Sequence, residues 1–310
     1  MSIDIQGRMD AAFRKVLDDG YTTHKIDRDR VLYLRPSSFS YCPLATFLNF
    51  PVSLSKSQPN NFSTTFFTRV GTVTHEIWQE TFLSVFGQSG SVRLIRDWVC
   101  LKCKERVPLR YSAPKSCKSC GTNRFKSDEH EIRTKSLSGH VDDILVFVVD
   151  RKKYAVVIDY KSTSTYKIDK KKIGSDPSYE AQISSYATLV EPKLAKLGIT
   201  LAGWCLAYFT RDNPFRFKLV SGTKRMPVSQ LRSWAAQHKF VLDLTNWEEV
   251  QALVANRCCK TVKDASRLHP HCRHATFCTG GEKRASAHAK TVWLAVEPKT
   301  PVRAYLKKER

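Results

Sequence analysis

Two acids and a lysine stand near the ends of two adjoining apolar segments. Asp142 lies in GHVDDILVFVVD, and Asp159 and Lys161 lie in KYAVVIDYKS. Because side chains alternate along a strand, Asp159 and Lys161 share one face, which Asp142 on a paired strand can reach. Carboxylates bind hard divalent cations, which lower the pKa of a water, and a lysine can orient that water or stabilise charge on a phosphorane. The pattern predicts metal-dependent phosphodiester cleavage.

Three residues in segments of helical spacing support this prediction, since an Asp-x-Lys triplet alone is more often an exposed ion pair. His75 lies in VGTVTHEIWQETFLSVFG, and Gln182 and Tyr186 lie in PSYEAQISSYATLV. Gln182 and Tyr186 are separated by one helical turn and share one helical face. Singly, each residue also fits a structural place: a satisfied helix histidine, a surface glutamine and a core tyrosine. Their occurrence in one ordered series favours an active site.

Three further acids are close to this set in the sequence. Asp143 neighbours Asp142 but should point to the opposite face of its strand, so we expect it outside the metal ligands. Glu129 and Glu131 lie on the approach to the hairpin and are candidates for acids around the ligands rather than among them.

Eight of the ten cysteines fall into two groups, which favours metal sites over disulfides. The first group is Cys100-x-x-Cys103 followed by Cys117-x-x-Cys120. Two such knuckles supply the four thiolates of a closed tetrahedral Zn²⁺ site. A closed site has no open position for substrate, so we expect a structural zinc ribbon whose basic flanks add a grip on nucleic acid. Cys205, in the apolar segment GWCLAYF, is expected to be a buried structural thiol.

Helices and strands of ordinary pattern must position these residues. We expect a helix that ends near Gly20, helices over about 65–86, from Pro177 onward and over about 228–255, an antiparallel hairpin closed by DRKK, and a second strand pair that turns at Asn213-Pro214. The expected organisation is an N-terminal helical extension (1–35), a first part of the core (36–95), a zinc-ribbon insertion (96–126), a second part of the core (127–280) and a basic tail (281–310).

The charge of the chain indicates its partner. Lys and Arg number 51 against 29 Asp and Glu, a net charge of +22. A surplus of this size favours a polyanion, because phosphate binding releases counterions. At 42% hydrophobic residues the chain can bury a sizeable core. It contains no apolar stretch long enough to span a bilayer and no secretory leader, so we expect a cytoplasmic protein, of a prokaryote or a phage-infected cell, that does not bind membranes.

The motif series resembles that of RecB-like nucleases in the PD-(D/E)XK superfamily. The series is Gly71-x-x-x-His75, Gly139-x-x-Asp142, Ile158-Asp159-Tyr160-Lys161 and Gln182-x-x-x-Tyr186, and the resemblance covers residues from about 36 to 280. It implies an α/β fold, a restriction-endonuclease-like core with a mixed central sheet flanked by helices. It also implies that His75, Asp142 and Asp159 bind Mg²⁺ or Mn²⁺. Lys161 would assist the attacking water, and Gln182 and Tyr186 would line the active site.

The second cysteine group resembles that of the RecB-like nucleases with a 4Fe-4S cluster, among them the CRISPR-adaptation exonucleases and the AddB nuclease domain. In that subgroup one cysteine precedes the nuclease core and three follow it, which implies a cluster that ties the two chain ends together. The cysteines concerned here are Cys42, Cys258, Cys259, Cys272 and Cys278. The family spacing C-x-x-C-x5-C is broken, because His269 stands three residues before Cys272. One of Cys258 and Cys259 is then the expected fourth ligand, whereas ligation by His269 would favour zinc.

The resemblance implies a DNA exonuclease that acts on single-stranded or resected ends, in recombination, repair, phage DNA metabolism or CRISPR adaptation, with a partner protein from one of those processes. Two alternatives stay open at this point. A non-catalytic DNA-binding scaffold of a recombination or replication complex would keep the fold, although it has no need of a metal-binding face. An RNA-processing nuclease would use the same chemistry on RNA.

Overall fold

The computed structural model describes residues 62–86, 91–134, 137–169, 177–213, 216–242 and 247–256, together with Leu44 and short stretches between 278 and 290. The chain divides into two compact units. The first, termed the sheet unit, comprises Tyr33–Ser40 and Val73–Ala236, and the second comprises Met1–Leu32, Tyr41–Thr72 and Gln237–Arg310. Among the helices so described, none combines the length and the hydropathy that a membrane span requires.

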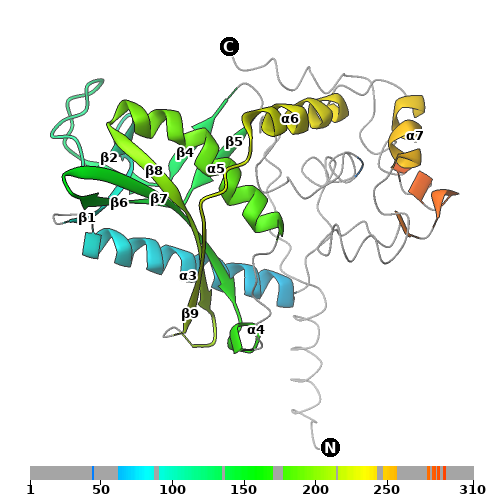
Figure 1. The fold of residues 1–310 in the computed structure, drawn as a ribbon, viewed down its shortest axis with the longest axis horizontal. Helices are drawn as coiled ribbons and strands as arrows, with labels where there is room; N and C mark the ends of the chain where they lie inside the picture. Colours follow the sequence, from blue (N-terminus) through cyan, green and yellow to red (C-terminus); the bar gives the residue numbers. More distant parts are fainter. Residues whose placement is uncertain are drawn as a thin grey trace, which may run out of the picture. The chain divides into compact units, whose positions relative to one another are not determined.

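A seven-stranded mixed sheet forms the centre of the sheet unit, with strand order β2-β1-β6-β7-β8-β9 and with β3 also paired to β1 (Figure 1). Its strands are β1 (Val92–Cys100), β2 (Arg106–Arg110), β3 (Phe125–Asp128), β6 (Asp143–Val149), β7 (Lys152–Thr163), β8 (Ile199–Thr210) and β9 (Phe217–Gly222). β7 and β8 pair in parallel. Since parallel neighbours need a crossover, the chain passes between them through α4 (Thr165–Asp169) and α5 (Pro177–Lys196).

β6 and β7 form the predicted antiparallel hairpin. At its turn, Asp150 and Arg151 have φ angles of 47° and 62°, the left-handed pair that a two-residue type I′ turn requires. A turn of this type follows the twist of the strands and fixes their register, in which Asp143 lies opposite Ile158. Asp142, the residue before β6, is thereby brought beside the last residues of β7.

Two helices cover opposite faces of the sheet, as Figure 1 shows for α3 (Phe62–Phe86) and α5. Ile183 and Leu194 of α5 are fully buried in an apolar cluster with β1, β6, β7 and β8. Trp78 and Phe82 of α3 pack against a second cluster on the other face. The predicted helices over 65–86 and from Pro177 are therefore present, and the expected mixed sheet flanked by helices is confirmed.

Alternation along β7 decides which residues face which helix. Val157 packs in the cluster under α5, whereas Ile158 and Tyr160 pack in the cluster under α3. Asp159 and Lys161 follow Val157 in steps of two and therefore face α5.

The cysteine-containing insertion continues the sheet beyond β1. β2 and β3 both pair with β1 in antiparallel register. Cys100 is the last residue of β1, and the other three cysteines lie in the connections between these strands. A separate two-stranded sheet of β4 (His130–Arg133) and β5 (Ser138–Val141) follows and leads directly into the hairpin of β6 and β7.

Two predictions about secondary structure and burial were wrong. The single helix expected over about 228–255 is two helices, α6 (Val228–Leu242) and α7 (Trp247–Ala255). α7 has acids in its first turn and two buried valines on one face, the features of a helix with its own start. Cys205 in β8 is only half-buried. The expected N-terminal helix and the segment around Cys42 lie outside the described residues, as does the turn at Pro214.

Candidate active site and metal centres

The two acids of the β6–β7 hairpin, Asp142 and Asp159, lie just before the start of β6 and near the end of β7. The two side chains are close enough that the charge of Asp142 contributes to raising the pKa of Asp159. Asp142 is held from the side, because the backbone N–H of Tyr160 donates a hydrogen bond to its Oδ2 over 2.7 Å. A carboxylate fixed by a strand backbone is rigidly placed, as a metal ligand must be.

His75 of α3 reaches the same point from the other side of the hairpin. Its Nε2 lies 2.8 Å from Asp142 Oδ2, and its Nδ1 lies 4.0 Å from Glu129 Oε1. One donor atom from each of these three residues lies within 4.8 Å of the other two. Burial lowers the pKa of His75, but its hydrogen bond to Asp142 and the charges of Asp142, Glu129 and Asp159 together outweigh burial and leave the pKa above the ordinary value. Metal ligation by both groups would require this proton to leave, so cation and proton compete here.

Glu129 lies closer to His75 and Asp142 than the sequence indicated. It was expected outside the ligands, yet it stands among the three grouped donors. Gln79 of α3 donates a hydrogen bond to its Oε1 over 3.0 Å, and Arg106 donates one to its backbone oxygen over 2.8 Å. Glu131 pairs with Arg106 at 3.4 Å instead and stays outside the group.

Asp159, Lys161 and Gln182 form a triangle beside the metal ligands. Lys161 Nζ lies 2.5 Å from Asp159 Oδ2 and donates a hydrogen bond to Gln182 Oε1 over 3.3 Å. The amide nitrogen of Gln182 donates one to Asp159 Oδ1 over 3.3 Å. One glutamine thus holds both members of the ion pair, which explains why a helical Gln belongs to this site.

The two charges of the triangle have shifted pKa values. Burial raises the pKa of Asp159 to about 6, although the charge of Lys161 opposes the rise. For Lys161, burial lowers the pKa, but the Asp159 carboxylate outweighs burial and keeps the pKa above its ordinary value. The Lys161 ammonium also lies 4.8 Å from the centre of the Tyr179 ring. Lys161 is therefore a cation and a hydrogen-bond donor at neutral pH, and not a base.

Asp143 points away from Asp142 and Asp159, to the face of the sheet that α3 covers. Its Oδ1 lies 3.0 Å from Arg96 Nε, and its Oδ2 accepts a hydrogen bond from the Tyr160 hydroxyl over 2.8 Å. Burial raises its pKa to about 7, against the charge of Arg96. The Tyr160 ring in turn contacts the His75 ring in an edge-on arrangement, with 5.4 Å between their centres. Asp143 thus supports the ring that packs beside His75.

Tyr186 lies one helical turn after Gln182 and is buried in the core cluster under α5. Burial raises its pKa above the ordinary value, and a hydrogen bond with Gln182 opposes the rise. The structure therefore places Tyr186 behind Gln182, with its ring in the core.

A buried polar network joins the ribbon to this site. Asp97 of β1 accepts hydrogen bonds from the backbone N–H groups of Leu109 and Glu131, over 3.0 and 3.1 Å, and lies 2.8 Å from His130 Nδ1. Burial alone would raise the pKa of Asp97, but these bonds hold it below the ordinary value. Arg106 contacts Asp97 Oδ2 at 3.2 Å as well as Glu129. The position of Glu129 therefore depends on β1 and β2.

The four cysteines of the ribbon converge. Cys100 Sγ lies 3.5 Å from Cys120 Sγ, and Cys103 Sγ lies 3.5 Å from Cys117 Sγ. All four sulfurs lie within 4.8 Å of one another. Disulfide sulfurs are about 2.0 Å apart, whereas Zn–S bonds of about 2.3 Å in a tetrahedron put the sulfurs about 3.8 Å apart. The spacing fits a single ion.

The two Cys-x-x-Cys knuckles have the same backbone conformation. Each pair of cysteines is followed by a residue of left-handed conformation, Lys104 with φ 63° and Gly121 with φ 73°. The N–H groups of these residues donate to the oxygens of Cys100 and Cys117, over 3.0 and 2.9 Å. The two turns are therefore alike, although they are far apart in the sequence.

The second cysteine group falls mostly on residues that the structure does not describe. Cys42, Cys258, Cys259 and Cys272 lie outside the described residues, as does His269. Cys278 is described and buried. The iron–sulfur cluster therefore stays a prediction.

Comparison with known proteins agrees with this geometry. Residues 37–279 match the family model of the PD-(D/E)XK nuclease superfamily. No curated protein matches the chain. Among solved structures, "Crystal structure of SSO0001" aligns with 77% of this chain and 87% of its own at 11% sequence identity, with a TM-score of 0.35, a likeness too weak to carry an argument. Because the family match covers well over half of the sequence, the chain belongs to the PD-(D/E)XK nuclease superfamily.

Proposed function

We propose that this protein is a Mg²⁺- or Mn²⁺-dependent deoxyribonuclease, an exonuclease that acts on single-stranded or resected DNA ends. The observation that carries the proposal is the grouping of His75, Glu129 and Asp142 next to the ion pair of Asp159 and Lys161. Carboxylate and imidazole donors suit these cations. The net charge of +22 supports a nucleic acid substrate.

Each residue has a part that follows from its contacts. His75, Glu129 and Asp142 would hold the cation, with Asp159 as a further carboxylate beside them. A bound divalent cation lowers the pKa of a nearby water and offsets the charge of the phosphate. Lys161 donates a hydrogen bond to the attacking water or to the phosphate oxygen that gains charge. The water oxygen forms a bond to phosphorus as the bond from phosphorus to the leaving oxygen breaks. The water proton passes to solvent, and the leaving oxygen takes a proton from solvent.

A cleavage assay tests the proposal. Wild type and Lys161→Ala are incubated with Mn²⁺ and with 5′- and 3′-labelled single-stranded and double-stranded DNA, and Lys152→Ala serves as a charge-matched control at the far end of β7. Wild type and Lys152→Ala should degrade DNA from an end, and Lys161→Ala should not. The proposal fails if wild type cuts nothing or if Lys161→Ala cuts as well as wild type. If RNA is cleaved in preference to DNA, the substrate is RNA and not DNA.

We further propose two cysteine-bound cofactors. Zn²⁺ at Cys100, Cys103, Cys117 and Cys120 is supported by the sulfur spacing and the paired turns described above. A 4Fe-4S cluster at Cys42, Cys272, Cys278 and one of Cys258 and Cys259 is supported by the resemblance of their order along the chain to the iron–sulfur subgroup. The process served would then be recombination, repair, phage DNA metabolism or CRISPR adaptation, with a partner protein from that process.

Metal analysis separates these cofactors. Protein purified without oxygen should contain one zinc and four irons per chain and show an absorption band at about 400 nm. Cys272→Ser should lose the iron and keep the zinc, and Cys117→Ser should do the reverse. Two zinc ions and no iron in the wild type would refute the cluster and favour ligation by His269.

A further inference from the structure

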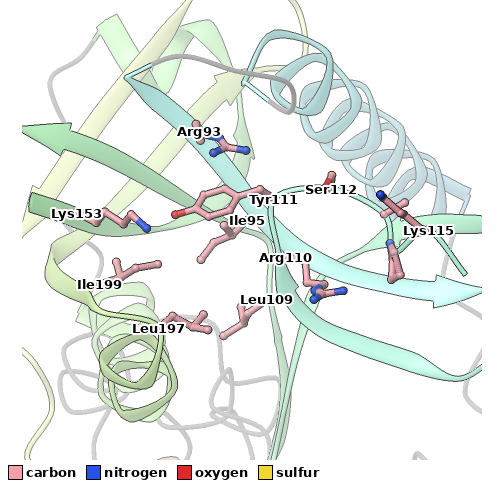
Figure 2. A pocket seen from close by; sticks show the side chains of 12 residues that line it. Arg93, Ile95, Leu109, Arg110, Tyr111, Ser112, Lys115, Lys153, Leu197 and Ile199 are labelled. Atoms are coloured by element: carbon pink, nitrogen blue, oxygen red, sulfur yellow. The ribbon is translucent and has the colours of Figure 1, made fainter. Parts of the chain in front are cut away.

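A pocket of about 450 Å³ lies at the other end of β7 from the candidate active site (Figure 2). It is lined by β1, by β2 and the residues that follow it, by the start of β7, and by the segment that joins α5 to β8. Lys153 of β7 lines it, and the eight residue-to-residue steps from Lys153 to Lys161 span about 26 Å of strand. No residue of the candidate active site lines this pocket, which is termed the basic pocket below.

The charges of the basic pocket all have one sign. Its lining includes the cationic side chains of Arg93, Arg110, Lys115 and Lys153 and no carboxylate. In the described part of the chain, none of the four forms an ion pair. Four positive charges without a counterion repel one another around a shared hollow, so a bound anion would lower their energy.

The floor of the pocket is apolar and contains an aromatic ring. Ile95, Leu109 and Ile199 are buried there, but Leu197 is 46% exposed. Figure 2 shows the ring of Tyr111 amid these side chains, and the guanidinium carbon of Arg93 lies 4.0 Å from the centre of the ring. Inorganic phosphate needs no such floor. A flat aromatic group joined to a phosphate would use both the floor and the cations.

We propose that the basic pocket binds one nucleotide of a single-stranded nucleic acid. The base lies against Tyr111 and Leu197, and the phosphates contact Lys153 and Arg110. Ligand sites in proteins are typically about 300–1,000 Å³, so the volume suits a ligand of this size. That the nucleotide belongs to a strand rests on the proposed function. Because the pocket is distant from the catalytic residues, it holds the strand without taking part in the reaction.

The zinc ribbon connects to this pocket through the sequence. Tyr111 and Lys115 belong to the segment between the second and third ribbon cysteines, Cys103 and Cys117. An ion that joins the two knuckles also closes this segment into a loop, and so orders one wall of the pocket. The ribbon then has a specific part in binding the strand.

Binding of labelled oligothymidylate to the full-length protein tests the proposal. Fluorescence anisotropy is measured without added divalent cation, so that nothing is cut, and without chelator, so that the ribbon keeps its zinc. Tyr111→Leu and Lys153→Gln should each weaken binding by about fivefold or more, as expected for loss of a stacking ring or a phosphate contact. Lys152→Gln is the matched control, because it removes the same charge from an exposed neighbour outside the pocket. It should change binding by less than about twofold.

Three competitors identify the occupant. An abasic oligonucleotide should bind wild type more weakly than oligothymidylate, and Tyr111→Leu should remove this difference. Equal affinity of wild type for both strands would overturn the proposal, as would displacement by polyglutamate as efficient as that by oligothymidylate. A third result would refute the strand as occupant: wild type binds thymidine monophosphate, but Tyr111→Leu and wild type bind oligothymidylate with the same affinity. Since no step involves cleavage, a protein that binds in this way but cuts nothing would contradict the proposed function alone.

Discussion

The two ends of β7 place lysines in opposite electrostatic settings. Lys161 lies 2.5 Å from Asp159 and is held by Gln182, whereas Lys153 borders a pocket with three other cations and no acid. A neutralised and fixed lysine can act at one chosen atom, and an unneutralised one attracts any phosphate that approaches. Changes at the first end should therefore alter the rate of the reaction, and changes at the second should alter affinity.

The largest effect is expected at the acidic end. Asp142→Asn keeps the shape of a group that His75 and the Tyr160 backbone both contact, but weakens cation binding. Cleavage should fall by about 1,000-fold or more, because several kcal/mol of charge stabilisation are lost. Single-turnover cleavage at saturating Mn²⁺ measures the rate. Oligonucleotide affinity without the cation should stay unchanged, and a parallel loss of affinity would contradict the separation of the two ends.

The buried acid of β1, Asp97, should contribute chiefly to the stability of the fold. Asp97→Asn should lower the free energy of unfolding by about 3 kcal/mol, because Arg106 and the backbone donors lose a buried charge. The pKa of Asp97 is lowered from 3.8 in the folded chain, so its stabilisation is present above that pH and is lost as the pH falls through the folded pKa. Chemical unfolding at several pH values should show the difference from wild type narrowing only below about pH 4. A gap that widens on acidification would refute this role.

Loss of the ribbon ion should affect both ends at once. Cys117→Ser removes one thiolate, so the wall at Tyr111 and the support of Glu129 by Arg106 both weaken. Strand affinity should fall by about tenfold, and the Mn²⁺ concentration for half-maximal cleavage should rise. Zinc content, anisotropy and cleavage are measured on the same preparation. If only strand affinity or only the Mn²⁺ requirement changes, the ribbon supports only the basic pocket or only the candidate active site.

A smaller effect should follow from Arg106→Met, which frees Glu129 but leaves the four cysteines intact. Partners that orient metal ligands typically contribute about tenfold to metal affinity, so half-maximal cleavage should need about ten times more Mn²⁺. Zinc content and strand affinity should be those of wild type. Arg124→Met, an exposed arginine of the ribbon, is the control. An unchanged Mn²⁺ requirement would show that Glu129 does not need this support.

The smallest effect concerns salt. One phosphate contact on a single strand contributes about 0.7 to the slope of log affinity against log salt concentration. Lys153→Gln should reduce the slope by about that amount, and Lys152→Gln should leave it unchanged. Anisotropy titrations at several salt concentrations measure both. Equal slopes for the two variants would remove Lys153 from the strand contacts.

The hairpin and the faces on which its acids lie were predictable because they depend on local pattern. Two runs of β-branched residues joined by a short polar turn indicate paired strands, and alternation correctly placed Asp143 away from Asp142. The importance of Glu129 was not predictable in this way. It lies between two short strands, and its position is set by Gln79 and Arg106, which are distant in the sequence.

Two further features were not predicted from the sequence. The basic pocket combines residues of β1, β2, β7 and β8, and no spacing connects Arg93 to Lys153. The separation of α6 from α7 was missed because apolar periodicity continues across both helices, whereas the acids that begin α7, Glu248 and Glu249, were read as part of one long helix.

The turn of Asp150 and Arg151 sets the register of β6 and β7, and so the positions of the acids at the other end of these strands. Because it contains two residues of left-handed conformation, its length and not its side chains sets which residues of β6 and β7 stand opposite one another. A register shift of one residue would turn Asp159 and Lys161 to the other face, toward α3. Over evolution, substitutions in this exposed turn by residues that readily adopt a left-handed conformation, such as Asn or Gly, should therefore be tolerated. A single insertion or deletion there should inactivate the protein, although the turn lies at the far end of the strands from Asp142 and Asp159.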